Sequence, residues 1–235
     1  MNIALLGYGR MGKAIEKIAV DRKHTIVARV NRPEEFTLEN ADVAIDFSIP
    51  EVAVSHLEKC FKAQVPVICG TTGWLDKFEE MAALCKKKES AFLYASNFSV
   101  GVNLFFEFNK KLAEVMAPRN EYQATLTEIH HTKKLDAPSG TAITLAEGII
   151  ENTTYTNWKL EEENKGNSNE TLVITSERTG DVPGTHIINY KSNVDTITIQ
   201  HEAHSRQGFA LGAIIAAEWI KGKKGIFSMK DVLDL

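Results

Sequence analysis

The fifteen residues from Glu128 to Ala142 contain two histidines, two lysines and a Ser-Gly-Thr turn. Imidazole and ammonium groups attract anions, and none of them is needed to build a core, so their combination indicates a site for a small anionic molecule. The two histidines, His130 and His131, are adjacent, and adjacent side chains on a strand point to opposite faces. They therefore need not do the same job. Lys134 is near enough in sequence to swing back over the end of such a strand.

The flanking residues place this stretch between a strand and a helix. Residues 123–129 alternate polar and apolar side chains, which predicts a strand, and residues 142–150 are typical of a helix. A helix N-terminus offers unpaired N–H groups and a partial positive charge, and Pro138 suits its first turn. Gly140 would let an anion approach the backbone, while Ser139 and Thr141 would add hydroxyl donors. These features predict a seat for a carboxylate or phosphate, although a Ser before a helix is also a common cap.

A second motif, Gly-x-Gly-x-x-Gly, lies near the beginning of the chain. Residues 2–6 predict a short apolar strand and residues 13–19 a helix, which is the context that a dinucleotide-binding motif requires. The first glycine makes the turn, the second lets the backbone approach a pyrophosphate, and the third lets the helix pack on the strand. The predicted cofactor-binding residues of this motif are Gly7, Tyr8, Gly9, Arg10, Met11 and Gly12.

The residues after the second predicted strand, 24–30, bear on the choice of cofactor. NAD-selective sites usually carry an acid there to hold the ribose hydroxyls, but this chain has Asn31 and Arg32. Arg32 can pair with a 2′-phosphate, or it can be a solvated loop residue. We therefore expect NADPH or NADH as the cofactor, with NADPH favoured.

The remaining pattern predicts an α/β fold in two domains. Strands at 41–48, 65–69 and 91–95 alternate with helices at 50–62 and 75–88, which favours a Rossmann-like parallel sheet. Strands at 171–178, 185–191 and 195–201 favour a second, α+β domain with a mostly open mixed sheet. The predicted dinucleotide-binding domain is 1–97 with 208–235, and the predicted substrate and oligomerisation domain is 98–207.

Three further expectations concern single segments. Residues 104–117 predict a helix whose core stripe contains Phe105, Phe108, Leu112 and Val115. Residues 157–170 are polar and predict a mobile loop, and residues 209–221 predict a helix.

Glu128 to Ala142 closely resembles the signature of the dihydrodipicolinate reductase family, Glu-x-His-His-x-x-Lys-x-Asp-Ala-Pro-Ser-Gly-Thr-Ala, with every fixed position met. A Gly-Thr-Thr-Gly loop from residue 70, an Asn-Phe-Ser stretch from residue 97 and the C-terminal ending extend the resemblance from Gly7 to Leu235. Residues 33–40 depart from it, because many members have a longer segment there.

The resemblance implies NAD(P)H-dependent reduction of 4-hydroxy-tetrahydrodipicolinate, a cyclic imine with two carboxylates, in diaminopimelate and lysine synthesis by a homotetramer. It implies that His130 and Lys134 are the catalytic acid groups. The residues implied to bind the substrate are His131, Lys134, Ser139, Gly140, Thr141 and Arg206. It further implies cofactor-binding residues in two loops. The loop with Gly70, Thr71 and Thr72 would hold the nicotinamide half, and Ser96, Asn97 and Phe98 lie where the chain leaves the cofactor domain.

Composition narrows the alternatives. The 235 residues carry a net charge of -4 and are 43% hydrophobic, which gives no support for nucleic-acid or membrane partners. No run approaches the roughly 20 apolar residues of a membrane span, and we expect no secretory signal. The cysteines, Cys60, Cys69 and Cys85, form no CxxC pair and fit a reducing, cytoplasmic setting. No metal site is predicted.

Two other functions remain open on the sequence alone. Another two-domain dehydrogenase, acting on an amino acid or sugar acid, would share the glycine motif but lack the His-His-x-x-Lys run. A regulator that senses a dinucleotide would need a basic nucleic-acid-binding segment, and none is visible.

Overall fold

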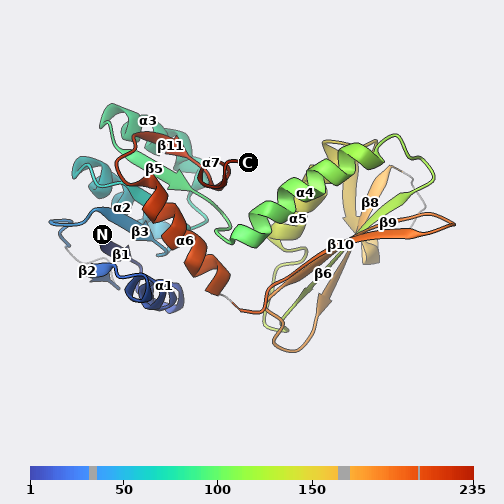
Figure 1. Cartoon of the computed structure of the whole chain (residues 1–235), viewed down its shortest axis with the longest axis horizontal. Coiled ribbons are helices and arrows are strands. Elements are labelled where there is room, and N and C mark those ends of the chain that lie inside the picture. The colour runs from blue at the N-terminus through green and yellow to red at the C-terminus, as the bar shows by residue number, and fades with distance from the viewer. Residues whose placement is uncertain (32–35, 164–169, 206) are drawn as a thin grey trace. The chain divides into compact units, whose positions relative to one another are not determined.

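The structure, a computed structural model, describes residues 1–31, 36–163, 170–205 and 207–235. Its contacts divide the chain into two compact units, each with its own sheet (Figure 1). Unit 1 comprises Met1–Val100 and Gln207–Leu235, and unit 2 comprises Gly101–Arg206. The predicted α/β fold class is confirmed, because the first sheet is parallel and Rossmann-like and the second is mixed.

The sheet of unit 1 has six strands in the order β11-β5-β4-β3-β1-β2, and every neighbouring pair is parallel. Its strands are β1 (Asn2–Leu6), β2 (Thr25–Val30), β3 (Val43–Asp46), β4 (Val67–Cys69), β5 (Ala91–Tyr94) and β11 (Gly225–Phe227). The order reverses between β1 and β3, and the crevice at such a switch point is where doubly wound sheets bind ligands.

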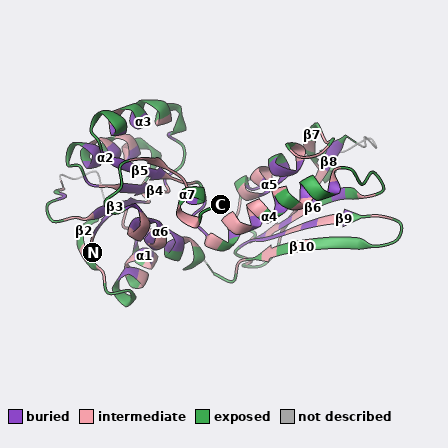
Figure 2. Ribbon diagram, turned by 45° about the horizontal axis from the view of Figure 1, so that its top comes forward, coloured by how far each residue is buried: buried purple, intermediate pink, exposed green. Residues whose placement is uncertain are grey.

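Helices cover both faces of this sheet, so its strands are apolar on both sides. Ile3 and Leu5 pack in one core with α1 and α6, while Ala4 and Leu6 pack in a second core with α2 and α3 (Figure 2). The helices of unit 1 are α1 (Arg10–Asp21), α2 (Pro50–Lys62), α3 (Phe78–Lys87, after a 3-10 turn at Leu75–Lys77), α6 (Gln207–Ile220) and α7 (Met229–Leu233).

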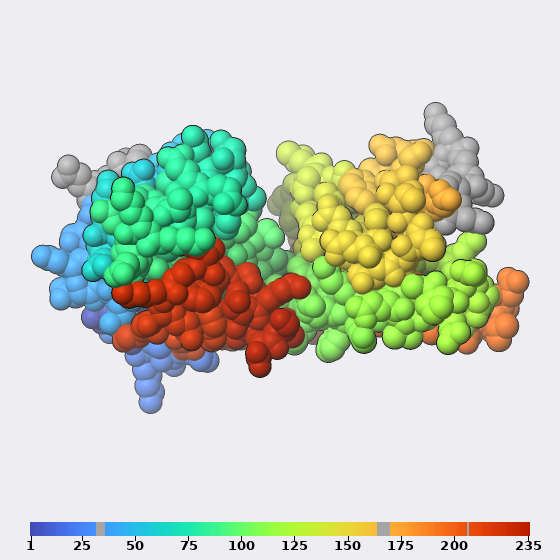
Figure 3. All heavy atoms as spheres, turned by 90° about the horizontal axis from the view of Figure 1, so that it is seen from above, coloured from blue at the N-terminus to red at the C-terminus, as the bar shows by residue number. Residues whose placement is uncertain are grey.

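The C-terminal segment belongs to unit 1. β11, which was not predicted as a strand, extends the sheet beside β5. In the space-filling view this segment, coloured red, lies against the turquoise region of α3 (Figure 3).

The three cysteines of the chain are buried free thiols, and burial raises the pKa of each one.

The sheet of unit 2 has five strands in the order β10-β9-β6-β8-β7. β9 is antiparallel to both β10 and β6, whereas β6, β8 and β7 are parallel. Helices α4 and α5 share one core with the inward-facing residues of β6, β8 and β9. The elements of unit 2 are α4 (Val100–Met116, beginning at the last residue of that part of unit 1), β6 (Gln123–His130), α5 (Gly140–Ile150), β7 (Asn157–Leu160), a 3-10 turn (Glu161–Glu163), β8 (Thr171–Arg178), β9 (Thr185–Lys191) and β10 (Thr196–Glu202).

The predicted loop at 157–170 is wrong in its first part. Residues 157–160 form β7, which pairs in parallel with β8 and places Trp158 beside Leu172. Its side chains alternate between exposed and half-buried. The prediction missed this strand because the segment is short and mostly polar. Pro138 is also misplaced by the prediction, because it precedes the N-cap of α5 and lies outside its first turn.

The predicted core stripe of α4 is wrong at two of its four residues, since Phe105 is buried and Leu112 packs against the core. Phe108 and Val115 are exposed, and the buried face carries Val102, Phe105, Asn109, Ala113 and Met116. The cause is a polar residue that an apolar pattern leaves out: the Asn109 amide donates to the Leu145 carbonyl of α5 at 2.9 Å. Among the described residues, no helix has the length and apolarity to cross a membrane.

Candidate active site

The core-facing side of β6 changes character along the strand. Alternate residues point inward, and after Ala124 and Leu126 the next two inward positions are Glu128 and His130. The period of the strand therefore carries a carboxylate and an imidazole to one face, near the carboxyl end of the strand. The Glu128 side chain is fully buried, a position that a carboxylate rarely occupies unless it is paired.

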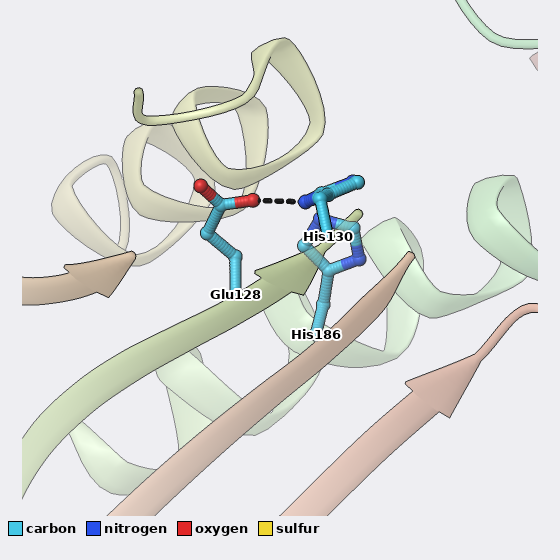
Figure 4. A group of neighbouring side chains, drawn as sticks. All are labelled: Glu128, His130 and His186. Atoms are coloured by element: carbon cyan, nitrogen blue, oxygen red, sulfur yellow. Dashed lines mark ion pairs between the residues drawn. The ribbon is translucent and has the colours of Figure 1, made fainter. Parts of the chain in front are cut away.

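Neighbouring strands supply the partners of Glu128. In the register of the sheet, His130 lies opposite Arg178 of β8, and Glu128 lies opposite His186 of β9. Arg178 donates from Nη2 to Glu128 Oε1 at 2.8 Å, and His130 Nδ1 forms an ion pair with Glu128 Oε2 (Figure 4). The rings of His130 and His186 meet edge to face with centroids 5.3 Å apart. The backbone N–H of Ser139 approaches Glu128 Oε1 at 3.4 Å.

Burial and pairing set the charges of this cluster. Burial alone would raise the pKa of the Glu128 carboxyl, but hydrogen bonds from His130 and Arg178 lower it to about 2. Burial lowers the pKa of His186, and repulsion from His130 adds to this, bringing it to about 3. Near neutral pH Glu128 is therefore an anion and His186 is neutral.

The cluster also has the spacing of a metal site. Glu128, His130 and His186 each offer a ligand atom, and these atoms lie within 4.8 Å of one another. However, Arg178 already balances the carboxylate charge, and His130 Nδ1 already contacts its second oxygen. These contacts favour an ion-paired cluster over a metal ligand set.

Lys134 and His131 lie in the loop between β6 and α5. The Lys134 ammonium contacts both carboxylate oxygens of Asp136 at 2.8 Å, and this contact lowers the pKa of Asp136. The Asp136 carbonyl accepts a hydrogen bond from Arg178 at 2.6 Å. A continuous chain of polar contacts thus connects Lys134, through Asp136 and Arg178, to Glu128. His131 is half-buried.

The start of α5 differs from the predicted anion seat in one respect. Ser139 is the N-cap, and its side chain accepts from the Ala142 N–H at 3.2 Å and meets His186 Nε2 at 3.3 Å. Ser139 is only 2% exposed, so its hydroxyl is used inside the protein. Gly140 is exposed, with nothing within 4 Å of where a Cβ would lie, and Thr141 is half-buried. The open part of the helix end is therefore at Gly140 and Thr141.

In unit 1 the predicted dinucleotide motif borders a cavity of about 230 Å³ at the switch point. The predicted residues that line it are Gly7, Tyr8, Gly9 and Asn31. Residues after β3 and from α2 complete the lining, and they include Phe47, Ser48 and His56.

The three glycines of the motif differ in what a side chain would meet at each position. Gly7 has φ +94, and a Cβ there would strike the Phe47 carbonyl. A Cβ at Gly12 would strike the Gly7 carbonyl, whereas nothing lies within 4 Å of a Cβ at Gly9. No side chain caps α1, which begins with the exposed Arg10 and the half-buried Met11. The open backbone at Gly9 and the uncapped helix end match the requirements of a pyrophosphate seat.

Asp46, fully buried at the end of β3, joins the β3 and β4 ends of the sheet. Its carboxylate accepts hydrogen bonds from the Thr71 hydroxyl, from the Ser48 N–H at 3.1 Å and from the Ser48 hydroxyl at 2.8 Å. His56 Nδ1 contacts its other oxygen at 2.6 Å, and the Gly70 N–H donates to its carbonyl at 2.9 Å. The Thr71 hydroxyl, predicted to face the nicotinamide, is therefore engaged inside the protein.

The other residues predicted to bind the cofactor in the loops after β4 and β5 differ in how far they are buried. Thr72 and Ser96 are exposed, while Asn97 and Phe98 are buried. The Phe98 ring packs on Phe47 with centroids 5.6 Å apart. Phe98 therefore fixes this segment to the core of unit 1.

Two predicted residues, Arg32 and Arg206, lie outside the described residues. Conversely, sequence reasoning missed His56, Arg178 and His186. No motif surrounds them, and they reach their sites only through contacts between distant segments. A strand that ends in a buried acid at a switch point was the available signal for Asp46, and the Glu-x-His spacing on one strand face was the signal for Glu128.

Comparison with solved structures first defines the class of fold. An oxidoreductase from Agrobacterium radiobacter, in complex with NAD+, L-tartaric acid and magnesium, aligns with a TM-score of 0.57 at 9% identity, over 99% of this chain and 92% of that one. A dipicolinate-bound dihydrodipicolinate reductase from Paenisporosarcina sp. TG-14 aligns with a TM-score of 0.76 at 22% identity, over 97% of each chain. At these identities the likenesses show a shared fold, a Rossmann unit combined with a second sheet-bearing unit.

Sequence comparison then identifies the family. Residues 1–98 match the family described as dihydrodipicolinate reductase, N-terminus, and residues 101–233 match dihydrodipicolinate reductase, C-terminus. The 4-hydroxy-tetrahydrodipicolinate reductase of Christiangramia forsetii is 52% identical over 99% of this chain and 98% of its own length. That of Lawsonia intracellularis is 34% identical over 99% of both. The chain belongs to the dihydrodipicolinate reductase family.

Proposed function

We propose that this protein reduces 4-hydroxy-tetrahydrodipicolinate to tetrahydrodipicolinate with NADPH or NADH, in diaminopimelate and lysine synthesis. The substrate gains a hydride on the ring and loses its hydroxyl as water, which consumes one proton. The observation that carries the proposal is the imidazole of His130, held on a buried, ionised carboxylate close to the open start of α5. This arrangement combines a proton donor with a seat for an anion in one unit.

The proposed catalytic acids are His130 and Lys134. His130 is 8% exposed, so its proton is shielded from bulk water. Lys134 is paired with Asp136, and a substrate carboxylate would compete with Asp136 for this ammonium. Binding of the dicarboxylate would then release Lys134 toward the substrate.

The substrate carboxylates are proposed to lie on the backbone N–H groups of Gly140 and Thr141, with His131 and Arg206 as further cationic partners. Gly140→Val tests this seat, because the space around Gly140 admits a branched side chain without a clash inside the protein. Losing a charged hydrogen bond of about 1.5–3 kcal/mol should raise KM for the substrate about ten- to a hundredfold. NADPH binding should change little. An unchanged KM would mean that the anion binds elsewhere.

The dinucleotide is proposed to bind at the unit 1 cavity, with its pyrophosphate on the backbone around Gly9 and the start of α1. When bound, it supplies the hydride. Asn31 lines the cavity where an acid would grip the ribose of NADH, so Arg32 is proposed to pair with the 2′-phosphate of NADPH.

The protein is further proposed to be a homotetramer of the cytoplasm. One face of β10 is exposed along its whole length (Figure 2), and the Thr198 hydroxyl on this face donates to Asn189 Oδ1 of β9 at 2.7 Å. A sheet face of this kind suits pairing with another copy. Light scattering at micromolar concentration should give four times the chain mass, and a monomer would reject this assembly. The buried free thiols support a reducing compartment.

The decisive test of the function is an assay with freshly prepared substrate that follows NADPH and NADH consumption. We expect turnover with both cofactors and none with common amino acids or sugar acids. Turnover of one of the latter compounds alone would favour the other class of two-domain dehydrogenase.

A further inference from the structure

We propose that Glu128 is the positioning residue of His130: its carboxylate holds Nδ1 of the imidazole, so that Nε2 delivers the proton, and Arg178 keeps that carboxylate in place as an anion. The inference rests on the proposed function, which assigns proton supply to His130. It adds two residues, Glu128 and Arg178, that act through the imidazole without touching the substrate.

The geometry fixes one ring nitrogen and leaves the other uncovered by side chains on one side. Glu128 and His130 are two residues apart on one strand face, and Nδ1 of the imidazole is ion-paired with Glu128 Oε2. On the other side of the ring, a Cβ at Gly184 would come within 3.0 Å of Nε2. Gly184 has φ +155, a conformation that favours glycine, and this residue leaves the Nε2 edge without a side chain over it. A carboxylate on one ring nitrogen sets both the orientation of an imidazole and the tautomer that it adopts.

The charged and titratable groups around His130 make Glu128 its counter-charge. They come from four strands and one loop: Glu128 of β6, Arg178 of β8, His186 of β9, His201 of β10 and Lys134 of the loop after β6. Of these, Glu128 is ion-paired with the His130 imidazole, and His186 meets its ring edge to face. Burial lowers the pKa of both His186 and His201, so near neutral pH neither adds a positive charge to the cluster. Asp136 is occupied by Lys134. Glu128 is therefore the one anion in direct contact with His130 among the described residues.

Arg178 connects three segments of unit 2 through its hydrogen bonds. Its Nη2 donates to Glu128 Oε1 at 2.8 Å and to the Asp136 carbonyl at 2.6 Å, and its Nη1 donates to the Glu177 carbonyl at 2.8 Å. One guanidinium thus joins the end of β8 to the carboxylate on β6 and to the loop that carries Lys134. A buried carboxylate without such a partner would tend to take up a proton, and a neutral acid would no longer hold the imidazolium.

The variant Glu128→Gln separates the charge of the carboxylate from its shape. The amide oxygen can still accept from Arg178, but the amide nitrogen donates to Nδ1 and so favours the opposite tautomer of His130. We expect kcat to fall about a hundredfold, the low end of what a general acid contributes, with dinucleotide binding unchanged. The pH profile of kcat/KM should also change, because a neutral amide replaces the carboxylate that faces the imidazole.

Two further variants make the test specific. Glu128→Asp keeps the charge at a shorter reach, so its pH profile should return toward that of the wild type while kcat stays intermediate. Glu177→Gln is the matched control, since it neutralises an exposed carboxylate next to Arg178 without touching the cluster. It should leave kcat and the pH profile unchanged.

Treatment of the wild-type protein with EDTA tests the alternative of a metal site. Activity should be unchanged, and activity that is lost to EDTA and restored by Zn²⁺ would overturn the assignment.

The outcomes distinguish this inference from the function on which it rests. A wild-type protein that does not reduce the substrate rejects the proposed function. An active wild type whose Glu128→Gln variant keeps its kcat and its pH profile rejects the positioning role alone. If Glu128→Gln does not fold, 15N-histidine NMR of the wild type decides, with the His130 signal identified by its loss in His130→Asn. A protonated Nδ1 is expected, and an unprotonated Nδ1 would overturn the inference.

Discussion

Among the residues that the structure describes, each unit buries one carboxylate completely, and each of these carboxylates contacts a histidine, but the two clusters are balanced differently. Asp46 in unit 1 accepts from a backbone N–H and two hydroxyls, and its ionic partner is His56 at 2.6 Å. Glu128 in unit 2 has an arginine on one oxygen and a histidine on the other. A guanidinium stays charged at every physiological pH, whereas an imidazole does not.

This difference separates a structural cluster from one suited to chemistry. The donors around Asp46 come from the loops after β3 and β4 and from His56 of α2, so the carboxylate joins two strand ends and a helix beside the proposed dinucleotide cavity. Around Glu128, Arg178 provides a second cationic partner beside the imidazole. The carboxylate therefore keeps a positive partner at every stage of the proton transfer that is proposed for His130.

The largest difference between the two units should appear on substitution of Lys134. Lys134→Ala removes a proposed acid from unit 2 and should lower kcat by about 10²- to 10⁴-fold, the usual contribution of general acid catalysis. NADPH affinity, measured by fluorescence titration, should not change, because the dinucleotide cavity lies in unit 1. Lys133→Ala removes the adjacent exposed lysine and serves as the control. Near wild-type turnover of Lys134→Ala would contradict the catalytic role.

A change in the Asp46 cluster should act on stability instead. Asp46→Asn leaves the buried His56 without its carboxylate partner and weakens the bonds to Thr71 and Ser48. Breaking one side of such a pair costs about 3 kcal/mol, which denaturant unfolding would detect as a lower midpoint. Asp21→Asn, an exposed change at the end of α1, should have no measurable effect. Equal stability of the two variants would show that Asp46 does not join the strand ends.

The two clusters also show what a sequence can reveal. The glycine motif, the strands of unit 1 apart from β11, and the His-His-x-x-Lys run were predicted, because each depends on residues that are close in sequence. The partners were not. Arg178 and His186 meet Glu128 only through the pairing of β6 with β8 and β9, and no local pattern fixes that register. The misassigned face of α4 has a similar origin, since Asn109 is buried because of one carbonyl on another helix.

The pH dependence of stability should sharpen the contrast within unit 2. The pKa of His186 is lowered from 6.5 to about 3, so the unfolded chain binds a proton there that the folded protein excludes. Stability is therefore fully present above pH 6.5 and is lost as pH falls toward 3, at about 1.4 kcal/mol per pH unit. This amounts to about 2 kcal/mol at pH 5.

The variant His186→Phe keeps a ring against His130 and removes this titration. Its melting temperature should fall less steeply between pH 6.5 and 4.5 than that of the wild type. Some slope should remain, because the pKa of His201 is also lowered by burial. His204→Gln changes an exposed histidine and should keep the wild-type slope. If His186→Phe does so too, His186 is not the group that titrates.

The smallest expected effect concerns the cofactor, and it bears on unit 1 alone. Asn31 borders the cavity at the end of β2, and Asn31→Asp would place a carboxylate where a 2′-phosphate must lie. The new charge should weaken NADPH about tenfold, or about 1.4 kcal/mol, and leave NADH equal or better, since an acid there can bind both ribose hydroxyls. Arg32→Ala should act in the same direction by removing a cation that attracts the phosphate.

The ratio of the KM values for NADPH and NADH, each measured with saturating substrate, tests both variants. Asn193→Asp adds the same charge on an exposed turn of unit 2 and serves as the control. A wild-type enzyme that strongly prefers NADH, or variants that weaken both cofactors equally, would remove Asn31 and Arg32 from the cofactor site. The proposed catalytic cluster around Glu128 would be unaffected by that result, because its contacts among the described residues lie within unit 2.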